Sequence, residues 1–392
     1  MELNLQFPES MKDDIMFLNT IYHRPNRDND YTDMLEIIYK IISTGEKEVI
    51  SIPKPKMDIY VSKPEFKNSF YREFMPLSQV DKVSVPYKDI ELEIAKMAGP
   101  NYEKMYFENM RNRNRRANRN IHKWENVYGS DYDIEQWARI QWMLHHDNET
   151  VKKPTKGYTD IEVDTIDLNR FPEPGEVPIN AVTLVDAEGG VVYTLLLRNS
   201  KNPLIDEFEK DIEGFIGELH ELFDETYGKL DYKIYMYDEH DEMELIRDMF
   251  RIVNMLKLDF ILIWNMDFDI PYIIERIKVL GGDPSEVMTH RDFKRRAAYY
   301  SKPYDAGVVV NRSSRFVCSS YTTFYCQMVL YAGMRKGQGE LPSLNLNAVG
   351  KKEIGDEKIN YTEEANISTL PYVNYKKFVV LFTAPSYSNV CR

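Results

Sequence analysis

The stretch Phe260-Ile261-Leu262-Ile263-Trp264-Asn265-Met266-Asp267-Phe268-Asp269-Ile270-Pro271-Tyr272 decides the fold. Its first five residues form a short apolar run, which is typical of a strand buried on both faces. Polar residues follow at once, at the carboxyl end of the strand, where open α/β sheets place their ligand sites. Asp269 also suits the N-cap of a following helix with Pro271 in its first turn, and this purely structural role is the alternative for Asp269.

The segments around this stretch predict a mixed sheet that is covered by helices. Alternation and turn residues indicate strands at 158–163, 178–185, 191–197 and 230–237. Apolar residues at three- and four-residue spacing indicate helices at 205–223 and 243–256, and a third helix from near Asp269 to Gly281-Gly282. This order is compatible with a ribonuclease H-like nuclease core, although other folds share it.

A second acidic group precedes these segments, in Asp160-Ile161-Glu162. On a strand, residues i and i+2 point to the same face, so both carboxylates would project together while Ile161 turns into the core. Two neighbouring carboxylates repel each other unless a cation lies between them, and a hard divalent ion suits such a pair. The alternative is an exposed strand face with two solvated acids, since this tripeptide is common.

Length and composition limit the classes of protein to consider. The chain has 392 residues, enough for two or three domains, with 43% hydrophobic and 29% charged residues, which is typical of a globular protein. Neither a signal-peptide pattern nor an apolar run long enough to span a bilayer is present. The net charge of −13 argues against broad nonspecific binding of nucleic acid, but clustered metal-binding carboxylates would also make a nuclease acidic. The three cysteines lack metal-site or redox spacing, which fits a reducing compartment.

The two acidic motifs together are more specific than either alone. D-I-E, followed about 105 residues later by a strand that ends in N-x-x-F-D-x-P-Y, resembles the first two exonuclease motifs of the family B DNA polymerases. The flanking segments Phe171-Pro172-Glu173-Pro174, Pro178–Thr183 and Leu341–Leu346 resemble those of T-even phage polymerases. The resemblance is clear from about 157 to 380 and weaker before that. One departure is that Asn265 and Asp269 are four residues apart, one fewer than in most relatives.

The resemblance implies a fold and a domain organisation. We expect an α/β, ribonuclease H-like mixed-sheet exonuclease domain at 157–380, preceded by an α+β N-terminal domain at 1–150. The sequence motifs of the polymerase domain are absent, so the chain resembles the N-terminal and exonuclease part of such an enzyme, truncated before the polymerase domain. The implied setting is the cytoplasm of an infected host cell.

The resemblance also implies a mechanism, 3′→5′ proofreading hydrolysis of single-stranded or primer-template DNA with two Mg²⁺ or Mn²⁺ ions. Asp160 would bridge both ions, Glu162 would bind the water-activating ion, and Asp269 would hold the second ion. Asn265 and Phe268 would position the terminal nucleotide.

The family's third motif, Y-x-x-x-D, is missing. Leu381 stands where the tyrosine is expected and Pro385 where the aspartate is expected, so residues 381–392 form an atypical tail. We interpret this as the mark of a frameshift, an intron read-through or a gene break near Val380. Because one carboxylate ligand is lost, we expect weak or absent exonuclease activity.

A basic block in the first 150 residues leaves two interpretations open. Its arginines are Arg111, Arg113, Arg115, Arg116 and Arg119. They would either contact the phosphates of nucleic acid or form a solvated face, and no aromatic residues alternate with them to suggest base stacking. The alternative function is therefore a non-catalytic nucleic-acid-binding fragment that works with a separate polymerase chain and a replication clamp. A further alternative is an inactive remnant of a split gene, and none of these functions involves a membrane.

Overall fold

The structure is a computed structural model, in which the chain divides into two compact units, Met1–Lys152 and Lys153–Arg392. It describes residues 14–26, 31–68, 73–145, 154–165, 168, 170–201, 204–302, 308–337, 343–353 and 355. The expected tail at 381–392, and the stretch at 375–380 that leads up to it, lie outside these ranges. Within them, no helix combines the length and the apolar character needed to cross a membrane.

The first unit combines two small antiparallel sheets with helices, an α+β arrangement. One sheet has the order β1-β2-β3, formed by Ile15–His23, Met34–Ile41 and Lys47–Pro53. The other has the order β5-β4-β6, formed by Val80–Pro86, Lys56–Ser62 and Val127–Tyr128. The helices are α1 (Ile90–Ala98), α2 (Pro100–Arg111), α3 (Arg115–Asn118) and α4 (Ile134–His145). Apolar side chains from both sheets, α1 and α4 form one core, in which Trp142 is almost completely buried.

The second unit is built on a six-stranded mixed sheet with the order β10-β9-β8-β7-β11-β14. In chain order its strands are β7 (Lys156–Val163), β8 (Ile179–Asp186), β9 (Val191–Leu197), β10 (Asp231–Tyr237), β11 (Phe260–Ile263) and β14 (Thr323–Cys326). β8 pairs antiparallel with both neighbours, whereas the β7–β11, β11–β14 and β9–β10 pairs are parallel. The carboxyl ends of β7 and β11 therefore meet at one edge of the sheet.

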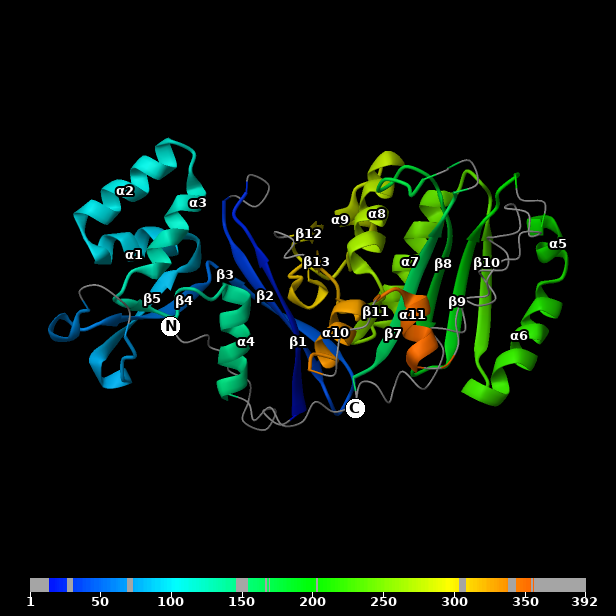
Figure 1. The fold of residues 1–392 in the computed structure, drawn as a ribbon, viewed down its shortest axis with the longest axis horizontal. Coiled ribbons are helices and arrows are strands. Elements are labelled where there is room, and N and C mark those ends of the chain that lie inside the picture. Colours follow the sequence, from blue (N-terminus) through cyan, green and yellow to red (C-terminus); the bar gives the residue numbers. More distant parts are fainter. Residues whose placement is uncertain are drawn as a thin grey trace. The chain divides into compact units, whose positions relative to one another are not determined.

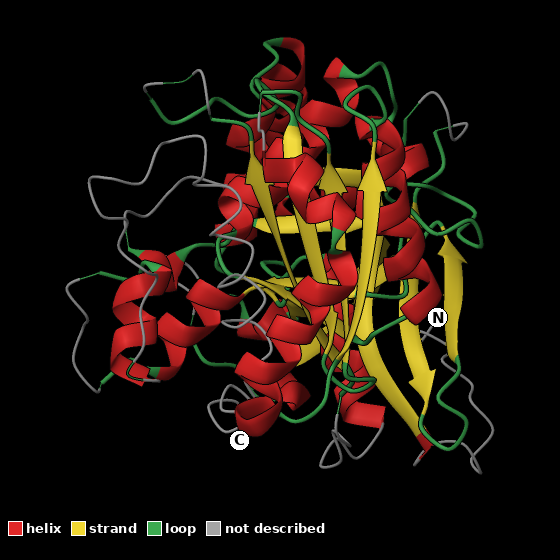
Figure 2. Cartoon of the chain, turned by 90° about the vertical axis from the view of Figure 1, so that its right-hand side faces the viewer, coloured by secondary structure: helices red, strands yellow, loops and turns green. Residues whose placement is uncertain are grey.

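Helices cover this sheet, as the sequence predicts. They are α5 (Leu204–Lys210), α6 (Ile212–Tyr227), α7 (Glu242–Leu256), α8 (Met266–Val279), α9 (Pro284–Val287), α10 (Gln327–Met334) and α11 (Leu346–Glu353). Figure 1 shows α5 and α6 beyond β10, and Figure 2 shows helices flanking the long strands. A separate hairpin pairs β12 (Ala298–Ser301) with β13 (Arg315–Cys318). The mixed α/β fold class predicted from the sequence is confirmed.

The prediction of one continuous helix after β9 is wrong. The apolar spacing predicts a single helix over 205–223, but α5 ends at Lys210 and α6 begins at Ile212. Asp211 lies between them with φ −139°, outside the helical region, and its side chain accepts a hydrogen bond from the Gly214 backbone N–H. Apolar spacing alone could not reveal the break, because the N-cap interrupts the backbone without interrupting the apolar stripe.

The predicted start of the helix after β11 is also wrong. α8 begins at Met266, with Asn265 at the N-cap position, so Asp269 is inside the helix and does not cap it. Pro271 likewise lies inside the helix and not at its first position. The purely structural N-cap role that the sequence left open for Asp269 is therefore excluded.

Candidate active site

The first acidic motif lies at the carboxyl end of β7, in the middle of the sheet. Thr159 is in register with Ile263, the last residue of β11, so Asp160 lies just beyond the end of that strand. Ile161 is buried between the two half-buried acids, as the alternation predicts. The register with β8 shifts directly after Glu162, and such irregularities commonly redirect a side chain at a functional site.

The second motif occupies the start of α8, which follows β11 directly. The Asp269 backbone N–H donates to the Asn265 carbonyl at 3.3 Å, so the two residues are one helical turn apart. The spacing of four residues between them is thus the spacing of one turn of this helix. The Asn265 side chain makes no capping hydrogen bond. Both motifs meet where β7 and β11 end.

Asp269 is almost completely buried at this edge, with only 3% of its surface exposed. Burial is the main cause that raises the pKa of Asp269 to about 7, and the negative charge of Glu162 acts in the same direction. Hydrogen bonds from Asp160 and from the Ile161 backbone oppose this shift. Asp160, Ile161 and Glu162 therefore all lie close enough to Asp269 to influence its pKa.

The donor set at this edge suits a hard divalent cation, because all three side chains are carboxylates. Among the described residues, Asp269 Oδ1 is buried and has no hydrogen-bond partner, and an unsatisfied buried acceptor of this kind is what a bound ligand would satisfy. In the same ranges, no three His, Cys, Asp or Glu side chains stand close enough together to hold a metal ion. The acids are thus gathered at one edge but are not drawn together as a finished coordination shell.

Two aromatic rings lie beside the acids. Phe268 precedes Asp269 in α8, and its ring packs 4.9 Å from that of Phe171 and 5.3 Å from that of Tyr272, centroid to centroid. Phe171 is 74% exposed, although an apolar ring gains by burial. Exposed aromatic rings next to a polar site are suited to stacking on the bases of a single strand.

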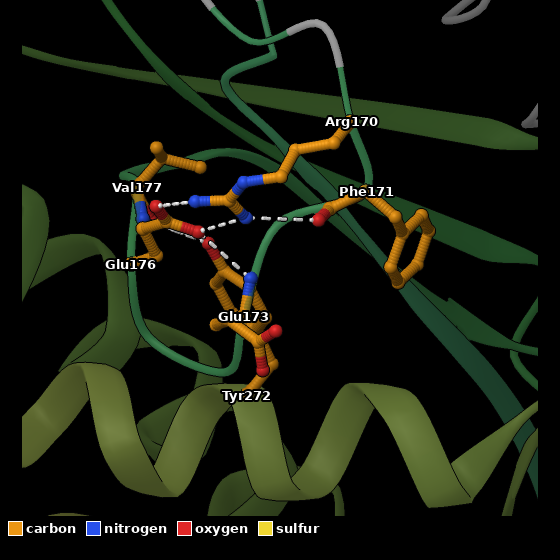
Figure 3. A network of polar contacts seen from close by, with 6 residues as sticks. All are labelled: Arg170, Phe171, Glu173, Glu176, Val177 and Tyr272. Atoms are coloured by element: carbon orange, nitrogen blue, oxygen red, sulfur yellow. Dashed lines mark hydrogen bonds and ion pairs between the residues drawn. The ribbon is translucent and has the colours of Figure 1, made fainter.

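The segment between the two motifs, residues 170–177, is held in place by polar contacts, and we term it the strap (Figure 3). Arg170 donates to Glu176 through both terminal nitrogens and to the Phe171 carbonyl, and the Glu173 N–H also donates to Glu176. The Tyr272 hydroxyl accepts from the Val177 N–H at 3.0 Å and donates to the Val177 carbonyl at 2.8 Å. The strap is thereby fixed to α8.

The buried ion pair between Arg276 and Glu242 also holds the strap in place. Arg276 donates to Glu242 from Nε at 2.7 Å and from Nη2 at 2.6 Å, and its Nη1 reaches the Gly175 carbonyl at 3.2 Å. Gly175 has φ +76°, and a Cβ there would lie 2.8 Å from the Glu275 backbone, so only glycine fits this close approach. The strap is therefore tied to α8 directly and, through Arg276, to α7.

Asp267, between Asn265 and Asp269, is also fully engaged. The Tyr300 hydroxyl donates to Asp267 Oδ1, and Arg312 Nη1 lies 3.2 Å from Oδ2. Burial and this contact with Asp267 raise the pKa of the Tyr300 hydroxyl, so it remains a proton donor throughout the physiological range. The first turn of α8 is thus tied to β12 and to the turn after η7 (Val309–Asn311).

The basic block lies in the first unit, at the end of α2 and in α3. The arginines whose side chains are described are all exposed, namely Arg111, Arg113, Arg116 and Arg119. Arg115 lies in α3, but its side chain is outside the described set. Asn109 Nδ2 donates to Asn118 Oδ1 at 2.9 Å and fixes the turn that carries the block. Phe107, 49% exposed, lies on the adjoining helix, an aromatic neighbour that the spacing of the arginines did not reveal.

Several residues of this site were missed by sequence reasoning. Phe171 was noted only as a flanking residue, and nothing in the sequence indicated that its ring is exposed and packs against Phe268. Asp267 could have been noted as a second acid within the motif that contains Asp269. The partners Tyr300, Arg312 and Arg276 carry no local signal, because each reaches the site from a distant part of the chain.

Comparisons with known proteins cover the segment that contains both acidic motifs. Residues 128–295 match the sequence model of the DNA polymerase family B exonuclease domain, a ribonuclease H-like domain. A DNA-directed DNA polymerase of Escherichia phage RB69 is 25% identical over 225 residues, which are 56% of this chain and 23% of that protein. The matched part is thus less than a quarter of that relative's length. Both acidic motifs lie in the matched segment, so the part of this chain that contains them is similar to the exonuclease region of phage-type family B DNA polymerases.

Proposed function

We propose that the second unit hydrolyses DNA from the 3′ end and that the first unit is the N-terminal domain of the same polymerase type. The observation that carries this proposal is the meeting of Asp160, Glu162 and the buried Asp269 at the carboxyl edge of β7 and β11. Unpaired 3′ ends of single-stranded or primer-template DNA are the substrate, in the cytoplasm of an infected host.

Three carboxylates would hold two Mg²⁺ or Mn²⁺ ions, with Asp160 shared between them, Glu162 on one and Asp269 on the other. Bound ions of this kind activate water and stabilise the leaving 3′ oxygen. Because the pKa of Asp269 is raised to about 7, Asp269 must release its proton before it can hold a metal ion. Asn265 and the ring of Phe268, extended by Phe171, would orient the last nucleotide so that its phosphate faces the acids.

The reaction is expected to be slow in this chain. No Y-x-x-x-D follows the Leu-Pro-Ser segment at 341–343, so the sequence offers no counterpart of the family's fourth carboxylate. Loss of one acidic ligand weakens metal binding and lowers the rate by orders of magnitude.

The test is hydrolysis of a 3′-mismatched oligonucleotide in Mn²⁺ by the wild-type chain and by Asp160→Ala. We expect slow release of nucleoside monophosphates from the 3′ end, which disappears in the variant. Release that persists unchanged in Asp160→Ala would contradict the proposal, because a contaminating nuclease or another site would then be responsible. A wild-type rate equal to that of an intact proofreading polymerase would contradict the proposed impairment.

The exposed arginines favour a second function for the first unit, binding of nucleic acid in concert with a separate polymerase chain and a replication clamp. Replacing Arg111, Arg113, Arg116 and Arg119 by Gln should weaken oligonucleotide binding and flatten its salt dependence by roughly one unit of slope for each phosphate that is no longer neutralised. The matched control is Arg247→Gln with Arg251→Gln, two exposed arginines of α7 that are already paired with acids. Equal effects of both sets would show that the block is only a solvated face.

A further inference from the structure

The first turn of α8 lacks the side-chain cap that usually fixes a helix start, because Asn265 makes no capping hydrogen bond. Asp267 in this turn is held from the side, by the Tyr300 hydroxyl on Oδ1 and by Arg312 on Oδ2 at 3.2 Å. The Asp267 side chain is only 12% exposed, so its contacts with Tyr300 and Arg312 are largely shielded from water. Charge-assisted hydrogen bonds of this kind can fix the backbone of the turn that carries Asp267.

Asp267 cannot share a ligand with Asp269 directly. Two residues along a helix are separated by about 200° around its axis, so the two carboxylates point to different sides. The side of Asp267 faces β12 and the turn after η7, whereas Asp269 faces β7. Asp267 can therefore change the position of Asp269 only through the backbone of the turn that both residues share.

Building on the function proposed above, we propose that Arg312 and Tyr300 are positioning residues, which act through Asp267 to set the direction of Asp269 and Asn265 at the metal-binding edge. They replace the missing N-cap. A charge effect without positioning would have the opposite sign, since removing the positive charge of Arg312 would make the edge more attractive to a cation.

The experiment compares Arg312→Gln, Arg312→Lys and Tyr300→Phe with the wild-type chain, using Mn²⁺ alone as the probe. We expect Mn²⁺ affinity to fall about 10–100-fold in Arg312→Gln, to recover largely in Arg312→Lys, and to fall less in Tyr300→Phe. The control is Tyr299→Phe, the same change at the neighbouring position of β12, which is exposed. Unchanged or increased affinity in Arg312→Gln would overturn the proposal.

Amide hydrogen exchange in the absence of metal separates this inference from the proposed function. Positioning predicts that exchange at Phe268 and Asp269 speeds up about ten-fold in Arg312→Gln and Tyr300→Phe, while amides in the last turn of α8 keep their protection. A wild-type chain that bound no Mn²⁺ would refute the proposed function, yet this local loss of protection would still support the anchoring role. Unchanged exchange in the first turn would refute the anchoring role itself, whatever the metal does.

Discussion

Helix α8 buries an ionisable residue near each end, and their surroundings are opposite. Arg276, 8% exposed, has each of its three nitrogens within hydrogen-bond distance of Glu242 or of the Gly175 carbonyl. Asp269, 3% exposed, meets further carboxylates and leaves Oδ1 without a partner among the described residues. Every side-chain nitrogen of Arg276 thus has an oxygen partner, whereas the charge of Glu162 that acts on Asp269 is negative, like that of Asp269 itself.

The surroundings of the two residues distinguish a buried charge that supports the fold from a buried charge that could bind a ligand. A buried charge that is paired and hydrogen-bonded belongs to the fold, and its removal damages stability. A buried acid that lies next to other acids lowers the stability of the fold, because like charges repel each other. Such an arrangement is typical of a site where a bound ligand offsets the repulsion. The two ends of α8 should therefore respond in opposite directions to substitution.

The largest effect is expected at the structural end. Arg276→Met should lower the free energy of unfolding by about 3–5 kcal/mol, because Glu242 would remain buried without a partner. Urea unfolding measures this loss, and the double variant Arg276→Met, Glu242→Leu should recover part of it. The control is Arg247→Met, whose exposed pair with Glu244 should matter by less than about 1 kcal/mol. A comparable loss of stability in Arg276→Met and Arg247→Met would mean that the buried ion pair of Arg276 matters no more than an exposed one.

Asp269→Asn should act in the opposite direction when metal is chelated. The folded-state pKa of Asp269 is raised, so the folded chain binds the proton more tightly than the unfolded chain, and stability is lost as pH rises from about 4 towards 7. Asparagine avoids this loss and should be more stable than the wild type at pH 8, by on the order of 1–2 kcal/mol.

Unfolding of Asp269→Asn and wild-type protein at pH 5 and pH 8 in chelator checks this sign. The stability gap should widen with pH, because only the wild type carries the Asp269 carboxyl group, whose raised pKa makes folding less favourable as pH rises. Glu162→Gln is the companion variant, because it removes one source of repulsion and should give a smaller gain. If Asp269→Asn were less stable than the wild type at pH 8, Asp269 would contribute to the stability of the fold, as Arg276 does.

The affinity for a metal ion should depend on pH through the same titration of Asp269. Because a cation must displace the proton held by Asp269, Mn²⁺ affinity of the wild-type chain should rise up to about ten-fold per pH unit below pH 7 and level off above it. Isothermal titration between pH 5.5 and 8 measures this slope. A flat profile would mean that the metal binds without Asp269.

How far the sequence could predict these features depends on the range of the interactions. The buried strand Phe260–Trp264 and the alternation in Asp160-Ile161-Glu162 are local patterns, so they predicted β11 and β7, whereas the joining of both acidic motifs in one site was implied only by the family resemblance. The start of α8 was predicted too late, because Asp269 and Pro271 form a convincing cap signal that the backbone at Asn265 overrides.

Long-range contacts could not be predicted in this way. Arg276 and Gly175 are 101 residues apart, and Tyr300 lies 33 residues from Asp267, so neither pair leaves a periodic signal in the chain. The pKa shift of Asp269 depends on its complete burial, which is a property of the assembled sheet. Chemistry could thus be inferred from residue types, whereas the supports of the site required the structure.

The smallest expected effect concerns the strap, which joins the two ends of α8. Phe171 lies at its functional end with a ring that is 74% exposed, so Phe171→Ala should change the free energy of unfolding by less than about 0.5 kcal/mol. If the ring stacks on a terminal base, the same variant should bind single-stranded oligonucleotides roughly five-fold more weakly, a loss of about 1 kcal/mol. Phe74→Ala, at a 92% exposed ring in the other unit, is the matched control and should leave affinity unchanged. Fluorescence anisotropy with a 3′-labelled strand measures both, and equal affinities for all three proteins would mean that the strap only supports the fold, as Arg276 does.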